Sequence, residues 1–186
     1  MLSSRRTDAR RNREAILRTA DEAFAEDVDL VPLSEIARRS GLGRATVYRH
    51  FSDRYALGLA VAESKLHLLR ELVADTDDAD FLEVLAELFE EQISRRPLVR
   101  LFRELSAADQ RRYADQLVAV LSPGLRRAQR AGAVRADVTP ADLALICEMV
   151  EGALSSHLPT GGVDSVERVV QTLLTGLRTT SGPAAE

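Results

Sequence analysis

The sequence is poor in the residues that define several protein classes. Cys147 is its single cysteine, which excludes an internal disulfide and a multi-cysteine metal site. It has no tryptophan and only 4% aromatic residues, so a core has to be built mainly from Leu, Val and Ala. No run approaches the roughly 18–20 apolar residues of a membrane span, and no signal segment opens the chain. We therefore expect a cytoplasmic protein without membrane contact.

The apolar residues that are present recur at helical spacing. Hydrophobic residues make up 45% of the 186 residues, enough to bury a sizeable core in one or two domains. They follow a period of about 3.6 residues, and no stretch shows the strict alternation of a half-buried strand. The sequence therefore predicts an all-α fold of about nine helices.

One stretch, residues 33–54, has the organisation of a helix-turn-helix. A short helix is expected to end at Gly41, where a positive φ costs a glycine little. Leu42 then fits between this helix and a second one, which is expected from about Arg44 to Phe51. The residues expected on the inward faces of the two helices are Leu33, Ile36, Ala37, Val47 and Phe51.

The opposite face of the second helix is polar. At about 100° per residue, it gathers Ala45, Thr46, Arg49 and His50. A hydroxyl, a guanidinium and an imidazole beside a small residue suit base edges and phosphates in a DNA major groove. The alternative is the solvated face of an ordinary helical hairpin, because this geometry also occurs in proteins that do not bind DNA.

Three motifs extend this pattern, namely AILRTADEAF at residues 15–24, LSEIARRSGLGRATVYRHF at 33–51 and SDRYAL at 52–57. With them, the segment from Asn12 to Leu57 resembles the N-terminal DNA-binding domain of the TetR family of transcriptional regulators. The resemblance implies base contacts by Ser34, Arg44, Ala45, Thr46 and Arg49. It implies phosphate contacts by Tyr48, His50 and Arg54.

The chain departs from the family pattern in three places. It has Asp27-Val28-Asp29 where the family usually has a glycine, and Val31-Pro32 where the family has a threonine pair. Both differences alter the start of the second helix, and Pro32 fits its first turn because the N–H that proline lacks goes unused there. The third difference, Arg54 in place of a lysine, keeps the positive charge.

The net charge of −4 is unevenly distributed. Residues 1–60 have 11 arginines and 9 acidic residues, a net +2, which leaves −6 for residues 61–186. The first 13 residues have five arginines and one aspartate, a net +4. A flexible basic arm there would lie along phosphates or in a minor groove, with a solvated tail as the alternative. The acidic remainder repels nucleic acid and indicates a different partner.

The rest of the pattern predicts a C-terminal helical domain. We place a DNA-binding domain at residues 1–52 and an effector-binding and dimerisation domain at 53–186. A long helix capped by Asp53 and ending near Ala74 is the mechanical link between them. Pro123 is expected to kink or break its helix, because a proline there removes a hydrogen bond. The other helices are expected over about residues 10–26, 82–96, 98–105, 109–131, 140–157 and 164–178.

The last two helices have apolar stripes that are broader than a single helical domain can cover on its own. In the resembling family these helices form a four-helix bundle across a two-fold axis, which implies a homodimer. The interface residues expected from this are Leu143, Ile146, Val150, Leu154, Val166, Val170, Leu173 and Leu177.

A small-molecule effector, largely apolar, is expected among the helices of the C-terminal domain. Phenylalanine, methionine and cysteine side chains provide adaptable apolar walls for it. The candidate pocket residues are His67, Phe89, Phe102, Tyr113, Cys147 and Met149. Core packing is the alternative role for the apolar members, and a surface position is the alternative for His67.

These features favour a ligand-responsive DNA-binding regulator, more often a repressor in such families, which binds a palindromic operator as a dimer and is released by a small molecule. One alternative is an all-α module whose helix-turn-helix docks on a protein partner. Another is an enzyme that uses a C-terminal cavity, but the sequence offers no nucleophile and base for it. The run from Gly41 to Gly43 lacks the third glycine of a dinucleotide site, and the three histidines are dispersed. We therefore expect no cofactor, no metal and no enzymatic activity.

Overall fold

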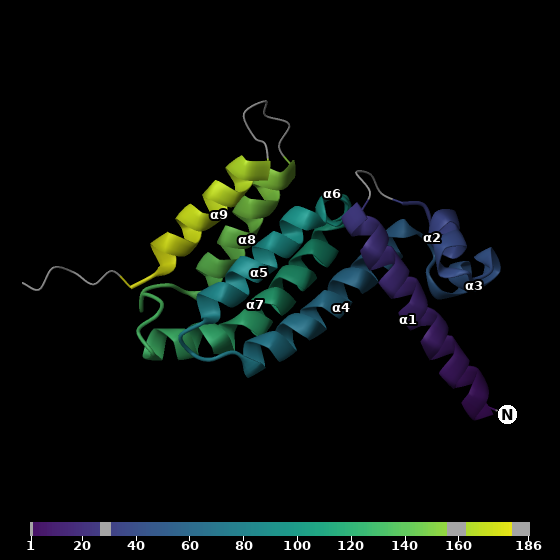
Figure 1. The fold of residues 1–186 in the computed structure, drawn as a ribbon, viewed down its shortest axis with the longest axis horizontal. Coiled ribbons are helices and arrows are strands. Elements are labelled where there is room, and N and C mark those ends of the chain that lie inside the picture. Colours follow the sequence, from purple (N-terminus) through teal and green to yellow (C-terminus); the bar gives the residue numbers. More distant parts are fainter. Residues whose placement is uncertain (1, 27–30, 156–162, 180–186) are drawn as a thin grey trace, which may run out of the picture. The chain divides into compact units, whose positions relative to one another are not determined.

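The computed structural model describes residues 2–26, 31–155 and 163–179. Within these ranges the chain forms nine α-helices, which confirms the all-α prediction, and an isolated bridge joins Val134 to Arg178. Over the same residues, every helix falls short of the length or the hydropathy that crossing a bilayer requires. In chain order the helices are α1 (Leu2–Glu26), α2 (Leu33–Ser40), α3 (Arg44–His50), α4 (Arg54–Asp75), α5 (Phe81–Ser94), α6 (Arg96–Arg103), α7 (Ala107–Arg130), α8 (Pro140–Ser155) and α9 (Val163–Leu177) (Figure 1).

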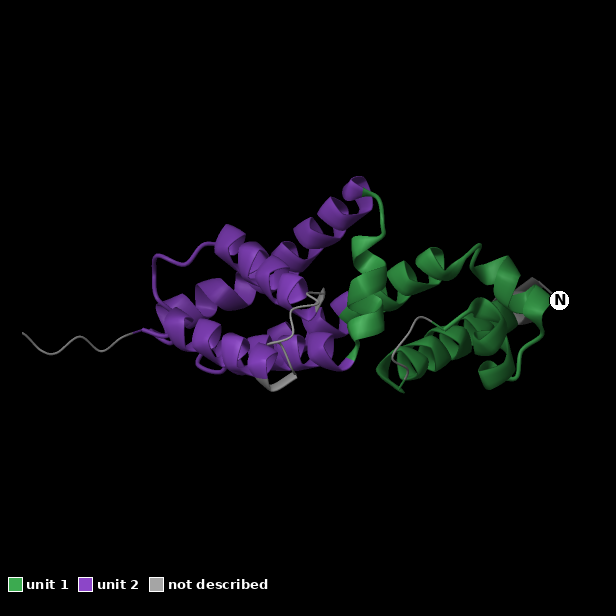
Figure 2. Cartoon of the chain, turned by 90° about the horizontal axis from the view of Figure 1, so that it is seen from above, with its two compact units in different colours: residues 1–65, 95–106 green, residues 66–94, 107–186 purple. Residues whose placement is uncertain are grey.

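The helices form two compact units, which Figure 2 colours separately. Unit 1 comprises residues 1–65 and 95–106, and unit 2 comprises residues 66–94 and 107–186. Helix α4 contributes residues to both units, and α6 packs in unit 1 although its neighbours along the chain, α5 and α7, pack in unit 2. This division differs from the expected boundary between residues 52 and 53, because the first half of α4 buries apolar side chains in the core of unit 1.

Unit 1 is organised around one apolar core. Helix α1 packs against α2 and α6, and α3 packs on α2. Helix α6 also approaches α4 closely, because a Cβ on Gly58 would lie 2.6 Å from Leu101 Cδ2. A glycine at residue 58 therefore makes room for α6. The buried core residues are Ile16, Ala20, Ala23, Phe24, Val31, Leu33, Ile36, Ala37, Val47, Phe51, Leu57, Ala60 and Val61.

Helix α1 begins at Leu2, earlier than the expected start near Arg10. The prediction of a flexible arm is therefore wrong for residues 2–9, which are helical. These residues contain neither glycine nor proline, so nothing in them breaks the helix that continues from residue 10. One turn further on, Arg10 Nε lies 3.4 Å from Glu14 Oε1, a pairing that adds local support of about 0.2–0.5 kcal/mol. The basic charge at this end of the chain is thus displayed on a helix.

The starts of α2 and α4 are capped differently. Pro32 is the N-cap of α2, one position before the first turn in which it was expected, and its side chain accepts no capping hydrogen bond. Asp53 caps α4 as predicted, because its Oδ1 accepts the Ala56 N–H at 2.8 Å. That bond lowers the pKa of Asp53 below its usual range. The departure at residues 27–29 lies outside the described residues.

Unit 2 is a bundle of α5, α7, α8 and α9 with the second half of α4 (Figure 1). Helix α5 contacts α7, α8 and α9, and α8 contacts α7 and α9. The buried residues of this bundle include Val73, Phe81, Leu85, Phe89, Leu117, Leu121, Leu125, Leu143, Cys147, Val150, Leu154, Val166, Val170 and Leu174.

Helix α7 is continuous through Pro123, so of the kink or break expected there, the break does not occur. Pro123 and Ala119 are both exposed, so water can solvate the Ala119 carbonyl that the proline leaves without a donor. The next residue, Gly124, is buried, and a Cβ on it would lie 2.6 Å from Phe81 Cδ2 and 3.0 Å from Val73 Cγ1. The packing of α7 in unit 2 thus depends on a glycine at residue 124.

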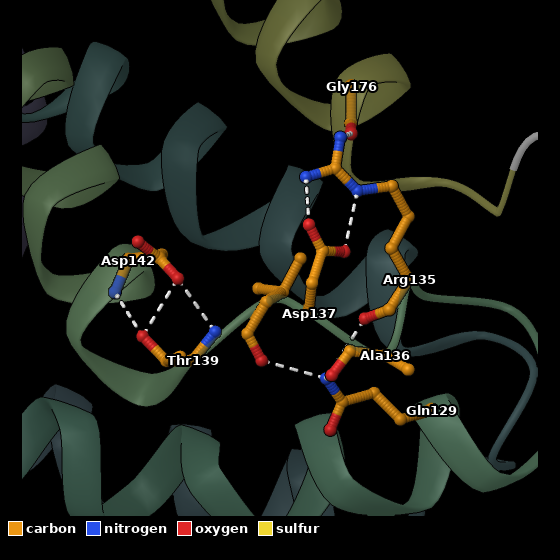
Figure 3. Close-up of polar contacts among 8 residues, drawn as sticks. Gln129, Arg135, Ala136, Asp137, Thr139, Asp142 and Gly176 are labelled. Carbon is orange, nitrogen blue, oxygen red and sulfur yellow. Dashed lines mark hydrogen bonds and ion pairs between the residues drawn. The ribbon is translucent and has the colours of Figure 1, made fainter.

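The segment between α7 and α8 is tied to the end of α9 (Figure 3). Gly132 turns the chain with a φ of 75°. Gln129 Nε2 then donates to the carbonyls of Arg135 at 2.9 Å and Val138 at 2.8 Å. Arg135 Nη1 donates to the Gly176 carbonyl at 3.1 Å. A cation at the C-terminal end of a helix complements the helix dipole, so this contact stabilises the last turn of α9.

Helix α8 starts at a reciprocal pair of side chains (Figure 3). The Thr139 N–H donates to Asp142 Oδ2 at 2.7 Å, and the Asp142 N–H donates to Thr139 Oγ1 at 3.3 Å. The first of these bonds lowers the pKa of Asp142. The pair satisfies N–H groups that a helix start otherwise leaves without a partner.

Candidate nucleic-acid interface

Helices α2 and α3 form the predicted helix-turn-helix in unit 1. Gly41 ends α2 with a φ of 69°, which a glycine adopts without strain. Leu42 follows and packs, half-buried, against the core of unit 1. Helix α3 then begins at Arg44, as expected. The predicted inward faces are confirmed, because Leu33, Ile36, Ala37, Val47 and Phe51 are all buried.

The outward face of α3 is polar. Val47 is fully buried and so fixes which side of the helix faces solvent. Ala45 and Arg49 are exposed, whereas Thr46 and His50 are half-buried. Arg49 Nη2 donates a hydrogen bond to Thr46 Oγ1 at 3.1 Å. This face therefore presents a hydroxyl and a guanidinium that are already oriented toward each other.

The other expected DNA contacts of the helix-turn-helix lie around this face. Tyr48 is 52% exposed on α3. Ser34 on α2 and Arg44 at the start of α3 line the same open depression of about 300 Å³, together with Leu42. The fold thus brings Ser34 and Arg44 together across the turn.

Two arginines of α2 are paired with an acid on the same helix. Glu35 accepts hydrogen bonds from Arg38 at 2.6 and 2.8 Å and from Arg39 at 2.9 Å. These bonds lower the pKa of Glu35 to about 2. Arg39 Nη1 also donates to Glu26 Oε2 at 3.4 Å, so two carboxylates balance the charges of Arg38 and Arg39. The positive field of the helix-turn-helix comes mainly from Arg44 and Arg49 of α3.

Arg54, which was expected beside a phosphate, contacts an acid within unit 1. Its Nη2 lies 3.1 Å from Oε2 of Glu104, the C-cap of α6, and the Tyr55 hydroxyl donates to the same oxygen at 2.8 Å. The Arg54 guanidinium also stacks over the Tyr55 ring, 4.8 Å from its centroid. Sequence reasoning missed Tyr55 and Glu104. The available signal was an acid at the C-terminal end of a helix, where the dipole disfavours it.

A second charged cluster joins three segments of unit 1. Asp21 on α1 lies 2.7 Å from Nε of Arg95, the N-cap of α6, and 2.7 Å from Nζ of Lys65 on α4. Burial raises the pKa of Asp21, but the hydrogen bonds and charges of Arg95 and Lys65 outweigh this effect, so the net pKa is lowered. Both ends of α6 are therefore held in unit 1 by charged side chains. The sequence contains no local signal for this cluster, because its members are far apart along the chain.

The six candidate pocket residues lie in different surroundings within the two units. Phe102 packs in unit 1, whereas the other five belong to unit 2. His67 is exposed, with Nε2 3.5 Å from Glu71 Oε1, and Met149 is 48% exposed. Phe89 is buried in the core of unit 2.

The fold does bring Tyr113 and Cys147 near each other. Burial raises the pKa of the Tyr113 hydroxyl, and the nearby Glu151 and Cys147 raise it further. Burial also raises the pKa of the Cys147 thiol to about 12, with a contribution from Glu151. Both groups are therefore neutral at physiological pH.

A groove of about 470 Å³ lies between α5 and α9, and the sequence did not predict it. Its walls combine apolar side chains with the carboxylates of Glu90 and Glu167. The spacing of residues along one helix does not show which other helix packs beside it, so the sequence contained no signal for this groove. The lining residues are Ala86, Glu90, Ile93, Ser94, Glu167, Val170 and Gln171.

Most of the expected interface residues face the interior of their own unit. The buried ones are Leu143, Val150, Leu154, Val166, Val170 and Leu177. They are core residues of unit 2, which corrects the expectation that they face a second chain. The reason is that α8 packs on α7 and α9 packs on α5, which covers these stripes within one protomer. Ile146 and Leu173 are half-buried, and the large apolar residues exposed on the two helices are Leu145, Met149 and Val169.

Known proteins match both parts of the chain. Residues 16–61 match the family described as "Bacterial regulatory proteins, tetR family". Residues 77–179 match the family described as "Transcriptional regulator SbtR-like, C-terminal domain". The second match alone covers more than half of the chain.

Individual relatives agree with these matches. The crystal structure of the TetR transcription regulatory protein from Mycobacterium vanbaalenii is 32% identical, with a TM-score of 0.66, and the match covers 93% of this chain and 98% of that one. The HTH-type transcriptional repressor Rv1474c of Mycobacterium tuberculosis is 26% identical over 80% of this chain and 83% of its own length. The HTH-type transcriptional regulator SAR0097 of Staphylococcus aureus is 36% identical over 64 residues, which span only 34% of its length. The chain therefore belongs to the TetR family of bacterial regulatory proteins.

Proposed function

We propose that the chain is a DNA-binding transcription regulator that reads base edges with α3. The observation that carries this proposal is the hydrogen-bonded pair of half-buried Thr46 and exposed Arg49, on a helix whose opposite face is anchored by Val47. A hydroxyl and a guanidinium one turn apart match the donors and acceptors that base pairs present in the major groove. The small side chain of Ala45 permits close approach to the bases.

The proposed interface makes two kinds of contact with DNA. Base contacts fix sequence preference, whereas phosphate contacts fix position and supply sequence-independent affinity. Arg44 stands at the start of α3 and suits either role. We assign base contacts to Ser34, Arg44, Ala45, Thr46 and Arg49. We assign phosphate contacts to Tyr48, His50 and Arg54.

We also propose that the regulator acts as a homodimer and that its two α3 helices engage the two halves of a palindromic site. Leu145 and Met149 on α8 lie one turn apart, as do Val169 and Leu173 on α9, so each helix has an outward apolar stripe. Burying such a stripe against a second copy removes apolar surface from water. This assignment replaces the buried residues that the sequence favoured.

We propose that a small molecule binds in unit 2 and regulates DNA binding. In the simplest case, the chain is a repressor that the small molecule releases from DNA. Helix α4 contributes residues to both units, so a change in unit 2 has a covalent route to unit 1. The effector must bind the DNA-incompetent arrangement more tightly, with a coupling of about 1–3 kcal/mol. The groove between α5 and α9 is a candidate site, because Ile93 and Val170 suit a largely apolar molecule and Glu90 suits a cationic group on it.

We propose a cytoplasmic role on DNA and no catalytic activity. The thiol of Cys147 is the strongest nucleophile in the sequence once ionised. Its pKa of about 12 and its burial keep it protonated and out of contact with a substrate. This side chain therefore contributes to packing in unit 2.

Selection of bound duplexes from a random pool tests the proposed function. We expect enrichment of a palindromic site and a binding constant that falls steeply with salt, because phosphate contacts release counterions. Failure to enrich any sequence, together with binding that does not depend on salt, would contradict the proposal. It would favour a protein-docking surface instead, for which Tyr48 is the exposed aromatic residue on α3.

A further inference from the structure

The end of α6 places a carboxylate on the start of α4. Glu104 Oε2 accepts a hydrogen bond from the Tyr55 hydroxyl at 2.8 Å and one from Arg54 Nη2 at 3.1 Å. Arg54 Nη2 also donates to the Tyr55 hydroxyl at 2.8 Å, which closes a three-membered cluster. All three residues belong to unit 1. The cluster therefore belongs to the same compact unit as the helix-turn-helix.

The position of Glu104 is built into the packing of α6. The Leu101 side chain fills the space over Gly58, and Arg95 at the other end of the helix pairs with Asp21. An acid at the C-terminal end of a helix opposes the helix dipole, so α6 itself gives no reason for a carboxylate at this position. The partners that favour the carboxylate are both on α4. The function of Glu104 therefore depends on its contact with Arg54.

Arg54 lies next to the proposed recognition helix. Only Phe51, Ser52 and Asp53 separate it from the end of α3. Its side chain is 45% exposed and that of Glu104 is 49% exposed, so the ion pair lies at the surface and can open. A phosphate that approaches Arg54 meets a carboxylate already bound to the same guanidinium.

We propose that Glu104 competes with DNA phosphates for Arg54 and so lowers the affinity of the regulator for DNA of any sequence. This inference rests on the proposed DNA-binding function and on the phosphate contact assigned to Arg54. A phosphate must either displace the carboxylate or accept its repulsion, and both reduce the gain from the contact. Tyr55 takes part, because its hydroxyl holds the competing carboxylate in place. Glu104 is thus a positioning residue, because it acts on DNA through Arg54.

Salt titrations of the full-length chain on selected and random duplexes test this role. Glu104→Gln is expected to tighten binding to both duplexes equally, by up to about tenfold at 50 mM salt for each recovered phosphate contact. The gain should shrink by 200 mM salt, by about threefold for each contact, because the slope of binding against salt steepens by about 0.9 for each contact recovered. Tyr55→Phe keeps the acid but loosens it, and should give a smaller gain in the same direction. Base preference should not change.

The decisive test is to introduce Glu104→Gln into the Arg54→Ala variant. In Arg54→Ala, the further change Glu104→Gln should have no effect, because the cation for which Glu104 competes is gone. Glu63→Gln is the matched control, since it removes one charge from another exposed acid of unit 1, which lies on α4. Thermal unfolding of each variant checks that unit 1 remains folded.

Several results would overturn the role of Glu104. An unchanged salt slope in Glu104→Gln would show that Arg54 was already available to DNA. Weaker binding would show that Glu104 orients Arg54 toward the phosphate. An equal gain in DNA affinity from Glu63→Gln would show that the effect depends only on net charge. A gain from Glu104→Gln that persists in Arg54→Ala would show the same. If the wild-type chain binds neither duplex, the proposed function itself fails, and this inference fails with it.

Discussion

Arg49 donates a hydrogen bond to Thr46 across one turn of α3, with Nη2 and Oγ1 3.1 Å apart. The bond restricts a long, exposed side chain before any partner arrives, which reduces the conformational entropy that binding has to remove. Thr46 is half-buried and Arg49 is exposed, so the threonine is the fixed end of the pair. The proposed recognition face is thus partly preorganised.

Arg49→Ala is expected to weaken binding to the selected duplex by about 1–3 kcal/mol and to relax the base preference at one position per half-site. Binding to random duplexes should stay nearly unchanged, because a base contact contributes little there. Thr46→Val, which keeps the shape but removes the acceptor, should cause a smaller loss. Salt titrations on both duplexes measure these effects. Equal weakening on both, with no change in base preference, would assign this face to phosphate contact and DNA shape.

Asp21→Asn is expected to destabilise the chain by about 1–3 kcal/mol at pH 7, because the partly buried Arg95 and Lys65 lose the charge-assisted hydrogen bonds to the Asp21 carboxylate. The folded-state pKa of Asp21 is lowered, so its stabilisation is complete above the ordinary pKa of about 4 and is lost as the pH falls through the lowered value. The difference from wild type should therefore shrink below about pH 4. Urea unfolding at pH 7 and pH 3 measures it. Glu22→Gln, at an exposed acid on α1, should change stability by less than about 0.5 kcal/mol.

Gly124→Ala is expected to destabilise unit 2 by up to about 2 kcal/mol. The new Cβ would lie 2.6 Å from the buried ring of Phe81, an overpacking cost of about 1–3 kcal/mol that exceeds the helix-propensity gain of about 1 kcal/mol. Gly176→Ala is the matched control in α9, because a Cβ there meets no atom within 4 Å and should stabilise by up to about 1 kcal/mol. Thermal unfolding measures both variants. Stabilisation by both would contradict the close approach at residue 124.

Met149→Asp is expected to shift the proposed dimer toward monomer and to weaken binding to a palindromic duplex by about 100-fold, because two linked α3 helices engage the half-sites together. The side chain is 48% exposed, so an aspartate there should leave unit 2 folded. Ala119→Asp adds the same charge to an exposed residue of α7 and should change neither property. Sedimentation at micromolar concentration measures the assembly. A wild-type chain that is monomeric under these conditions would contradict the dimer.

The parts of the fold that were predictable depend on interactions between neighbours in the sequence. Gly41 ends α2 and Val47 turns inward because of chain geometry within a few residues, and Asp53 caps α4 through the N–H of Ala56. Helical periodicity also marked the apolar stripes of α8 and α9. It could not say which neighbour covers a stripe, which is why Leu143 and Val166 were assigned to a second chain although their own unit buries them.

The contacts that were not predictable join distant segments. Arg54 and Glu104 are 50 residues apart, and Asp21 and Arg95 are 74 residues apart. No local pattern links such residues, because their pairing depends on α6 packing in unit 1 rather than with its neighbours along the chain. For the same reason, the sequence could place the residues of the α3 face but not the acid beside Arg54. The DNA contacts themselves stay predictions.

The return of residues 95–106 to unit 1 affects how the chain folds as it is made. The helix-turn-helix is synthesised early, but the surface of α4 around Gly58 stays uncovered until Leu101 has been added. At roughly 5–20 residues per second, the ribosome needs about 2–8 s to extend the chain from residue 65 to residue 106. During that interval the nascent chain exposes the apolar surface that α6 later covers. The part of the protein that is proposed to read DNA thus leaves the ribosome before α6 does, and it completes its core only after α6 has been added.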